Sequence, residues 1–162
     1  MFFAADRFAL RATALRGVLA GMCGCLLLAG ATFAQAAEYR SIAPSFAILY
    51  NAPTERARKM FIAPHGMPVE RILDLDGWTK IRDAEGDLSW VATQALSDKR
   101  TVVVTAVRTS VLAAMTDTAP LMATADKGVL FDMTTPAQAG WVGVRHQDGT
   151  AGYVRSNEVW GD

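Results

Sequence analysis

Residues 77–96 read GWTKIRDAEGDLSWVATQAL, and residues 140–159 read GWVGVRHQDGTAGYVRSNEV. The two stretches align without a gap. Their identical pairs are Gly77 and Gly140, Trp78 and Trp141, Arg82 and Arg145, Gly86 and Gly149, and Val91 and Val154. A Gly-Trp pair, an acidic residue followed by glycine, and an aromatic residue followed by valine therefore recur at one spacing. This recurrence indicates that a segment of the chain is duplicated.

Each copy has the pattern of β-strands joined by tight turns. The alternation along residues 78–82 predicts a strand with Thr79 and Ile81 on one face. The acidic-Gly pairs at 85–86 and 148–149 predict hairpin turns, because glycine accepts a positive φ without a steric cost. Both copies therefore contain a β-hairpin at the same place.

The remaining parts of the copies also correspond. Residues 93–96 and 156–159 predict short helical turns, with Thr93 or Ser156 as the N-cap. Upstream, each copy has a strand, a polar loop, a Gly-marked turn and a second strand. These features fall near Tyr50, 51–59, 66–68 and Val69 in the first copy and near Leu112, 116–120, 127–128 and Val129 in the second. Short strands between Gly and Pro turns favour a small all-β barrel for each copy.

The two barrels are expected to pack on each other. Each has roughly 60 residues, near the lower limit for a hydrophobic core without a covalent or metal staple. Residues 102–105 are β-branched throughout and predict a strand where the second copy begins.

The N-terminus has the pattern of a secretory signal peptide. Arg7, Arg11 and Arg16 precede an uncharged stretch, residues 17–33, which ends in Ala34-Gln35-Ala36. An uncleaved membrane anchor is the alternative, since the stretch is near the lower limit for a spanning helix. A lipoprotein would use Cys23 or Cys25, but the residues before them fit poorly. Cleavage after Ala36 would make the protein periplasmic, with membrane contact only before cleavage.

Cleavage would also change the composition. It removes both cysteines, so the remaining chain has no disulfide and no thiol nucleophile. Losing Asp6 and the three arginines from 16 acidic and 16 basic residues leaves 15 acidic and 13 basic ones. Without a basic surplus, nucleic acid is excluded as a partner.

Residues 66–96 resemble the bacterial SH3 domain, in its proteobacterial form. The stretch reads GMPVERILDLDGWTKIRDAEGDLSWVATQAL, and residues 140–160 resemble a second copy. The resemblance implies two tandem SH3-like small β-barrels over residues 37–100 and 101–162, after a signal peptide at 1–36. It also implies an accessory module of the cell envelope. Relatives are often joined to cell-wall hydrolases and bind peptidoglycan or its stem peptides.

The sequence departs from the family pattern in the first strand. That strand usually carries Asn-Val-Arg and then Ser-Gly-Pro, whereas residues 48–53 read ILYNAP and residues 112–114 read LAA. The arginine is absent from both copies, so a ligand contact made through it is not expected here.

We therefore predict an exported, non-catalytic binding module that recognises peptidoglycan or an extended peptide. The alternative is an interaction or structural protein that docks on another envelope protein. The candidate groove residues are Tyr50, Trp90, Tyr153, Arg82 and Arg145. An aromatic ring with a polar group suits a half-exposed groove, although packing in the core is an equal possibility.

For the two arginines and for the tryptophans of the Gly-Trp pairs, a structural explanation is favoured over ligand binding, although ion pairs of the arginines would stabilise the barrels little. Arg82 and Arg145 could pair with ligand carboxylates, but solvated ion pairs with the adjacent hairpin acids are favoured. These acids are Asp83, Glu85 and Asp148. Trp78 and Trp141 are expected to pack in the cores or at the edges of the barrels, because each would bury a large apolar area in a very small domain.

No catalytic, metal or cofactor site is predicted. The only histidines, His65 and His146, lie in predicted turns, and no Ser-His-Asp arrangement is recognisable. Arg56, Arg58 and Lys59 form a small basic cluster in the first loop. The cluster is either part of a solvated loop or a site that attracts an acidic wall polymer.

Overall fold

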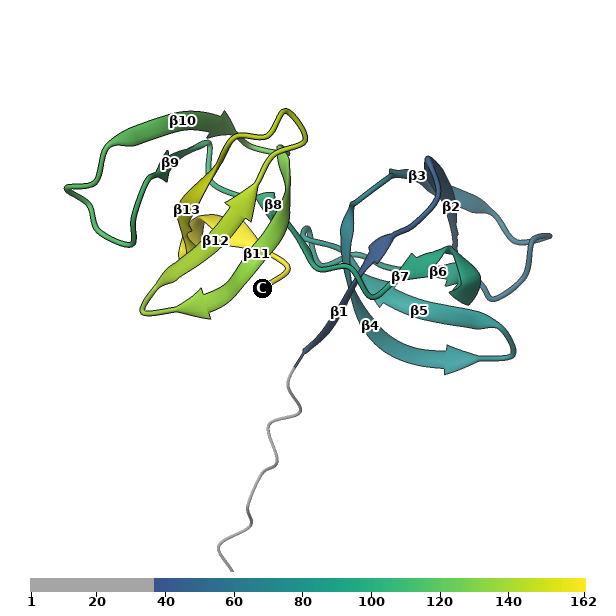
Figure 1. Ribbon diagram of the computed structural model, residues 1–162. Coiled ribbons are helices and arrows are strands. Elements are labelled where there is room, and N and C mark those ends of the chain that lie inside the picture. The colour runs from purple at the N-terminus through teal and green to yellow at the C-terminus, as the bar shows by residue number, and fades with distance from the viewer. Residues whose placement is uncertain (1–36) are drawn as a thin grey trace, which may run out of the picture. The chain divides into compact units, whose positions relative to one another are not determined.

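The computed structural model describes residues 37–162. The predicted signal peptide, residues 1–36, lies outside the described residues. The described chain forms two seven-stranded antiparallel sheets in tandem, each curved into a small barrel (Figure 1). The predicted all-β fold is therefore confirmed.

The first barrel contains β1 to β7 and one short 3-10 helix. Its elements are β1 (Glu38–Ile42), β2 (Phe46–Tyr50), β3 (Lys59–Pro64), β4 (Pro68–Leu75), β5 (Trp78–Arg82), β6 (Leu88–Ala92), η1 (Thr93–Ala95) and β7 (Leu96–Ser97). The second barrel consists of β8 (Thr101–Val104), β9 (Arg108–Leu112), β10 (Leu121–Asp126), β11 (Leu130–Gln138), β12 (Trp141–Arg145), β13 (Ala151–Arg155), η2 (Ser156–Glu158) and β14 (Val159–Trp160).

The two barrels have the same topology. The first sheet has the strand order β3-β2-β6-β5-β4-β1-β7, and the second has β10-β9-β13-β12-β11-β8-β14. Loop hydrogen bonds correspond as well: Gly66 donates its N–H to the carbonyl of Ile42, and Gly128 to that of Val104, both at 2.9 Å. The predicted duplication is confirmed in the backbone.

The Gly-Trp pairs owe their position to a turn. Asp76 and Gly77 have φ of 47° and 83°, and Ala139 and Gly140 have φ of 50° and 81°. Two successive positive φ values are the mark of the type I′ turn, whose twist matches the strands of a hairpin. Each tryptophan is therefore the first residue of the strand that leaves such a turn.

Each barrel has its own hydrophobic core. The first core is built from Ile42, Ala47, Leu49, Ala63, Val69, Ile81 and Val91, and the second from Val102, Val104, Val111, Ala125, Phe131, Val142, Val144, Val154 and Val159. On β5, Thr79 and Ile81 share the fully buried face and Arg82 is exposed, so the predicted alternation is present and the face with Thr79 and Ile81 is the one that packs in the core.

Residues near the junction of the two sheets connect them, as expected for domains this small. The rings of Tyr39 and Trp160 meet edge to face with their centroids 5.0 Å apart. Arg100 donates a hydrogen bond to the carbonyl of Gly161 at 2.9 Å, and Lys99 pairs with Asp132 at 2.8 Å. An aromatic pair, a hydrogen bond and an ion pair therefore link residues of the two sheets.

The predicted N-caps are wrong. Ala92 and Arg155 are the N-caps of η1 and η2, and no side chain caps either helix. The hydroxyl of Thr93 instead lies 2.9 Å from that of Thr79, because Thr93 is already inside the helical turn. Within residues 37–162, no helix is long and apolar enough to cross a bilayer.

Candidate functional site: an aromatic cavity on the first barrel

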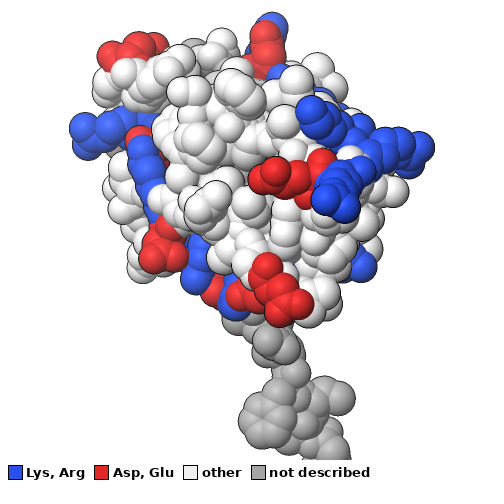
Figure 2. Space-filling view, turned by 90° about the vertical axis from the view of Figure 1, so that its right-hand side faces the viewer, with Lys and Arg blue, Asp and Glu red and all other residues white. Residues whose placement is uncertain are grey.

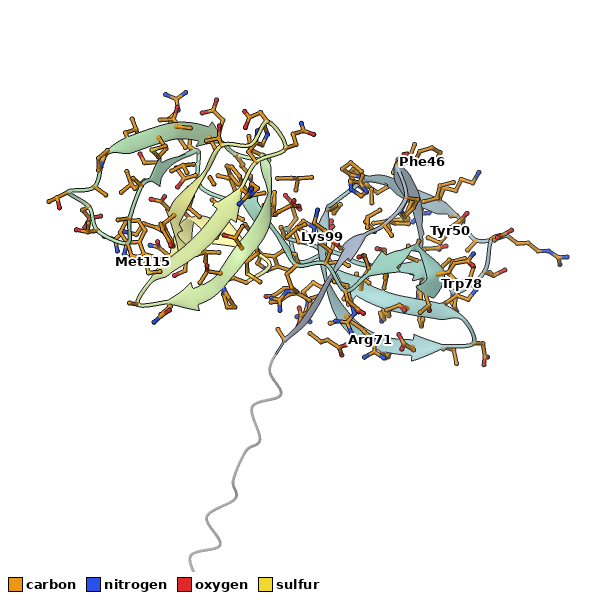
Figure 3. All side chains as sticks on the ribbon, viewed as in Figure 1. Phe46, Tyr50, Arg71, Trp78, Lys99 and Met115 are labelled. Carbon is orange, nitrogen blue, oxygen red and sulfur yellow. The ribbon has the colours of Figure 1, made fainter. Side chains whose placement is uncertain are left out.

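A cavity of about 230 Å³ lies on the outer face of the first barrel. We define the aromatic cavity by Phe46, Tyr50, Glu55, Trp78 and Ala92, which line it together with the neighbouring Pro44, Ala47, Ile48, Val91 and Ala95. Figure 3 shows Phe46, Tyr50 and Trp78 on one side of this barrel. Its walls are therefore built from β2, the loop after it, and the adjoining ends of β5 and β6.

The strand geometry explains why these rings gather. Phe46, Ile48 and Tyr50 alternate along β2 with the core residues Ala47 and Leu49, so they share the outer face.

The two central rings of the cavity form an aromatic pair. Tyr50 lies at the end of β2 and contacts the ring of Trp78 edge to face, with centroids 5.3 Å apart at 90°. This contact covers Tyr50 almost completely but leaves Trp78 only half-buried. Trp78 therefore keeps apolar surface exposed in the cavity.

Glu55 is the one charged residue among those that line the cavity. The loop that carries it, residues 51–58, is held by hydrogen bonds from Asn51 N–H to the carbonyl of Arg58 (3.1 Å) and from Arg58 N–H to Oδ1 of Asn51 (3.0 Å). Figure 2, which faces this side of the first barrel, shows a wide uncharged surface with acidic and basic side chains around it. The site thus combines apolar walls with one carboxylate at its edge.

The corresponding place in the second barrel is filled. The guanidinium carbon of Arg155 lies 4.0 Å from the ring centroid of Trp141, and the same guanidinium is paired with Asp117. Trp141 is only 4% exposed as a result, as expected for a core residue, whereas its counterpart Trp78 is not fully covered. Ala92 stands in the first barrel where Arg155 stands in the second. Its side chain ends at Cβ, so it is too short to cover the ring of Trp78 as Arg155 covers that of Trp141.

The structure does not bring the five predicted groove residues together. Tyr50 lines the aromatic cavity, and Trp90 lies opposite it on β6, half-buried, without lining the cavity. Tyr153 is half-buried in the other sheet, opposite Leu112.

The two predicted arginines are also apart from this cavity. Arg82 forms an ion pair with Glu70 on the adjacent strand, at 2.8 Å, rather than with the hairpin acids. Arg145 lines a different cavity and has no ion-pair partner among residues 37–162; Asp148, one of its expected partners, contacts His146 instead. An ion pair is therefore found for Arg82 with a different acid, and none for Arg145.

The sequence prediction missed Phe46, Glu55 and the exposure of Trp78. The difference between Ala92 and Arg155 was visible in the aligned copies, where it replaces a methyl group by a long cation. Its meaning depends on Asp117, which is 38 residues away from Arg155 along the chain.

A larger cavity of about 550 Å³ lies at the junction of the two sheets and is lined by both histidines. Each Nδ1 already has a partner: that of His65 lies 2.8 Å from the carbonyl of Ala43, and that of His146 lies 3.0 Å from Asp148. The N–H of Thr150 and the contact with His146 lower the pKa of Asp148. No group of three potential metal ligands occurs among residues 37–162.

These features define a class: a small β-barrel protein with a shallow aromatic site and no recognisable catalytic arrangement in its described part. Comparison with protein families identifies the family within this class. The model of the bacterial SH3 domain matches residues 43–98 and again residues 106–161, so the chain belongs to the bacterial SH3 domain family. Bacterial SH3 domains are binding modules.

Comparison with solved structures gives two distant matches. NlpC1 from Trichomonas vaginalis is 12% identical with a TM-score of 0.37, and the match covers 83% of this chain and 49% of that one. NlpC2 from Trichomonas vaginalis is 11% identical with a TM-score of 0.34, covering 78% and 48%. This chain thus spans about half the length of each. No curated protein sequence matches it.

Proposed function

We propose that this protein is an exported, non-catalytic binding module of the bacterial cell envelope, and that it recognises peptidoglycan through the aromatic cavity. The observation that carries the proposal is the difference between the two tryptophans. Trp141 is covered by the protein's own arginine, whereas Trp78 keeps an exposed surface in a cavity with Tyr50 and Phe46.

The physical argument concerns the cost of that exposure. Apolar rings left in water lose the stabilisation that burial would give, so a cluster of them on a small protein marks an interaction site. Phe46 belongs to this cluster and is 59% exposed. Aromatic walls suit peptide and sugar ligands, because the rings contact the apolar surface of the ligand while its polar groups remain in water. Membership of the bacterial SH3 domain family supports the same class of ligand, since these domains commonly bind peptidoglycan or proteins.

Export rests on the N-terminal pattern. The arginines, the uncharged stretch and the Ala34-Gln35-Ala36 site are the features that signal peptidase and the export machinery need. Sequencing the N-terminus of the protein recovered from the periplasmic fraction tests this, and the expected first residue is Ala37.

Co-sedimentation with purified sacculi tests the ligand. The protein should pellet with sacculi, and Phe46→Ala should weaken binding by about 3–10-fold, as expected from losing a half-buried aromatic contact of about 1 kcal/mol. Leu121→Ala is the matched control, because Leu121 is equally exposed, at 59%, on the other barrel. Phe46 is so exposed that its removal should leave the unfolding free energy nearly unchanged. A protein that stays in the supernatant, or a Phe46 variant that binds as well as the control, would overturn the proposal.

A second candidate function is docking on another envelope protein. Its support is β3, an edge strand of the first sheet with Met60, Phe61 and Ile62 all exposed. Edge strands with apolar side chains can add a strand from a partner. Ile62→Lys should abolish such docking and leave sacculus binding intact, which separates the two candidates.

A further inference from the structure

We propose that the aromatic cavity takes a cationic group, the free amine of a peptidoglycan stem peptide, and that Arg155 in the second barrel marks the position of that group. The inference rests on the proposed function and adds the chemistry that the cavity selects.

The first step is that Glu55 and Asp117 occupy equivalent positions. Their loops share two pairs of backbone hydrogen bonds, of which the first runs from Thr54 N–H to the carbonyl of Ala52 and from Thr116 N–H to the carbonyl of Ala114, both at 2.8 Å. The next bonds, from Ala57 to Thr54 and from Ala119 to Thr116, are both 3.1 Å long. One loop conformation therefore places an acidic side chain at the same point beside each tryptophan.

The second step is that the second barrel shows what fits between them. There a cation on an aliphatic stem lies over the face of Trp141 and pairs with Asp117. A cation over an indole is attracted by the ring quadrupole, and the carboxylate adds a charge-assisted contact. Arg155 therefore acts as a ligand that the barrel supplies to itself.

The third step is that the first barrel keeps the two recognition groups and lacks the occupant. Trp78 and Glu55 both line the cavity, and at position 92 there is only a methyl group. No ion pair of Glu55 is found within residues 37–162. A cationic group from outside would complete the same arrangement.

The charge of the cavity favours an amine over the other ionic groups of the wall. A ligand carboxylate would face Glu55 and be repelled. Arg56 and Arg58 lie on the same loop and are exposed, but neither lines the cavity, so its own charge is negative. In peptidoglycan, free amines belong to the diamino acid of the stem peptide. Its ammonium ends an aliphatic chain, and where the same carbon carries a carboxylate, as in diaminopimelic acid, that carboxylate must point away from Glu55 into solvent.

The test compares native sacculi with sacculi whose amines have been acetylated. Acetylation removes the positive charge and leaves the glycan and the peptide backbone, so binding of the wild-type protein should fall about 5–30-fold, as expected for one cation–π contact and one carboxylate pair. Glu55→Gln should lower binding to native sacculi by about 2–5-fold, as for a single exposed ion pair, and leave binding to acetylated sacculi unchanged. Glu85→Gln, which removes an equally exposed carboxylate on a hairpin away from the cavity, should change neither.

The outcomes separate the inference from the proposed function. If Phe46→Ala weakens sacculus binding but acetylation and Glu55→Gln do not, the cavity binds the wall, and the recognition of a cationic group is refuted. If native sacculi are not bound at all, both proposals fail in their stated form. A lysine peptide that competes with native sacculi, while the same peptide with norleucine in place of lysine does not, supports the cation directly.

Discussion

Replacing Ala92 by arginine should close the aromatic cavity from within. The substitution gives the first barrel the side chain that fills the second one, at the equivalent place on the equivalent strand. Trp78 and Glu55 are already in position to receive it. The loop that carries Glu55 shares backbone hydrogen bonds with the loop that carries Asp117, so we expect the arginine to fit without a rearrangement of the backbone.

The size of the effect follows from the two contacts. A cation–π contact at a partly exposed site contributes about 0.5–1 kcal/mol, and an exposed ion pair about 0.2–1 kcal/mol. Together they favour the closed state by about 1–2 kcal/mol. Because a ligand must first displace the arginine, its affinity should fall about 5–30-fold. The same free energy should appear as a gain in the unfolding free energy, since the contacts exist only in the folded protein.

Urea unfolding followed by tryptophan fluorescence, and co-sedimentation with native sacculi, measure the two quantities on one variant. Gln94→Arg is the control, because it adds the same charge at an exposed position of η1 that does not line the cavity. Adding Glu55→Gln to Ala92→Arg should reduce the gain in stability. If Ala92→Arg lost affinity without a gain in stability over the control, or bound sacculi as well as the wild type, the reasoning from the second barrel would be refuted.

Three further predictions concern stability, and urea denaturation measures each. A Cβ at Gly152 would lie 2.5 Å from the carbonyl oxygen of Leu112, so Gly152→Ala should cost about 1–3 kcal/mol by overpacking; an unchanged midpoint would contradict this close approach. Ala139 has a φ of 50° in its turn, so Ala139→Gly should relieve the left-handed strain and stabilise the protein by about 0.5–1 kcal/mol, whereas a loss of stability would argue against strain there. The hydrogen bonds from Arg71 and then from Thr79 lower the pKa of Asp74 below that of the unfolded chain. Their contribution is therefore present above the unfolded pKa of about 4 and is lost as pH falls through the folded pKa, so Asp74→Asn should flatten the pH dependence in the acid range, and an unchanged acid slope would exclude Asp74 as its source.

Local pattern predicted the fold because the deciding features are local. The glycines of the Gly-Trp pairs lie in turns with a positive φ, and the alternation along 78–82 correctly placed Thr79 and Ile81 on one face, which the structure shows to be the core face. The duplicated spacing then required both copies to share one topology, which they do.

The site was harder to predict because it depends on contacts between distant residues. Trp78 and Trp141 each follow a glycine at matched positions of the two copies, and both were expected to be packed in a core or at a barrel edge. They differ in exposure because of one residue on the neighbouring strand and an acid on a loop. The partner of Arg82 was missed for the same reason. Glu70 lies opposite Arg82 on the neighbouring strand, and the register of the two strands shifts between Arg71 and Leu73. No local sequence pattern shows that shift.

The difference between the barrels also fixes how many ligands the proposal allows. If both cavities were open, two linked sites could hold one wall polymer, and the affinity would exceed that of either site by avidity. Arg155 occupies the second position, so binding through this kind of site must be monovalent and its affinity must come from the first barrel alone. Duplication has then produced one barrel that holds its own cation and one that is open to a cation from outside. The second barrel supplies a folded neighbour for a domain near the lower limit of independent stability, and the first barrel supplies the recognition.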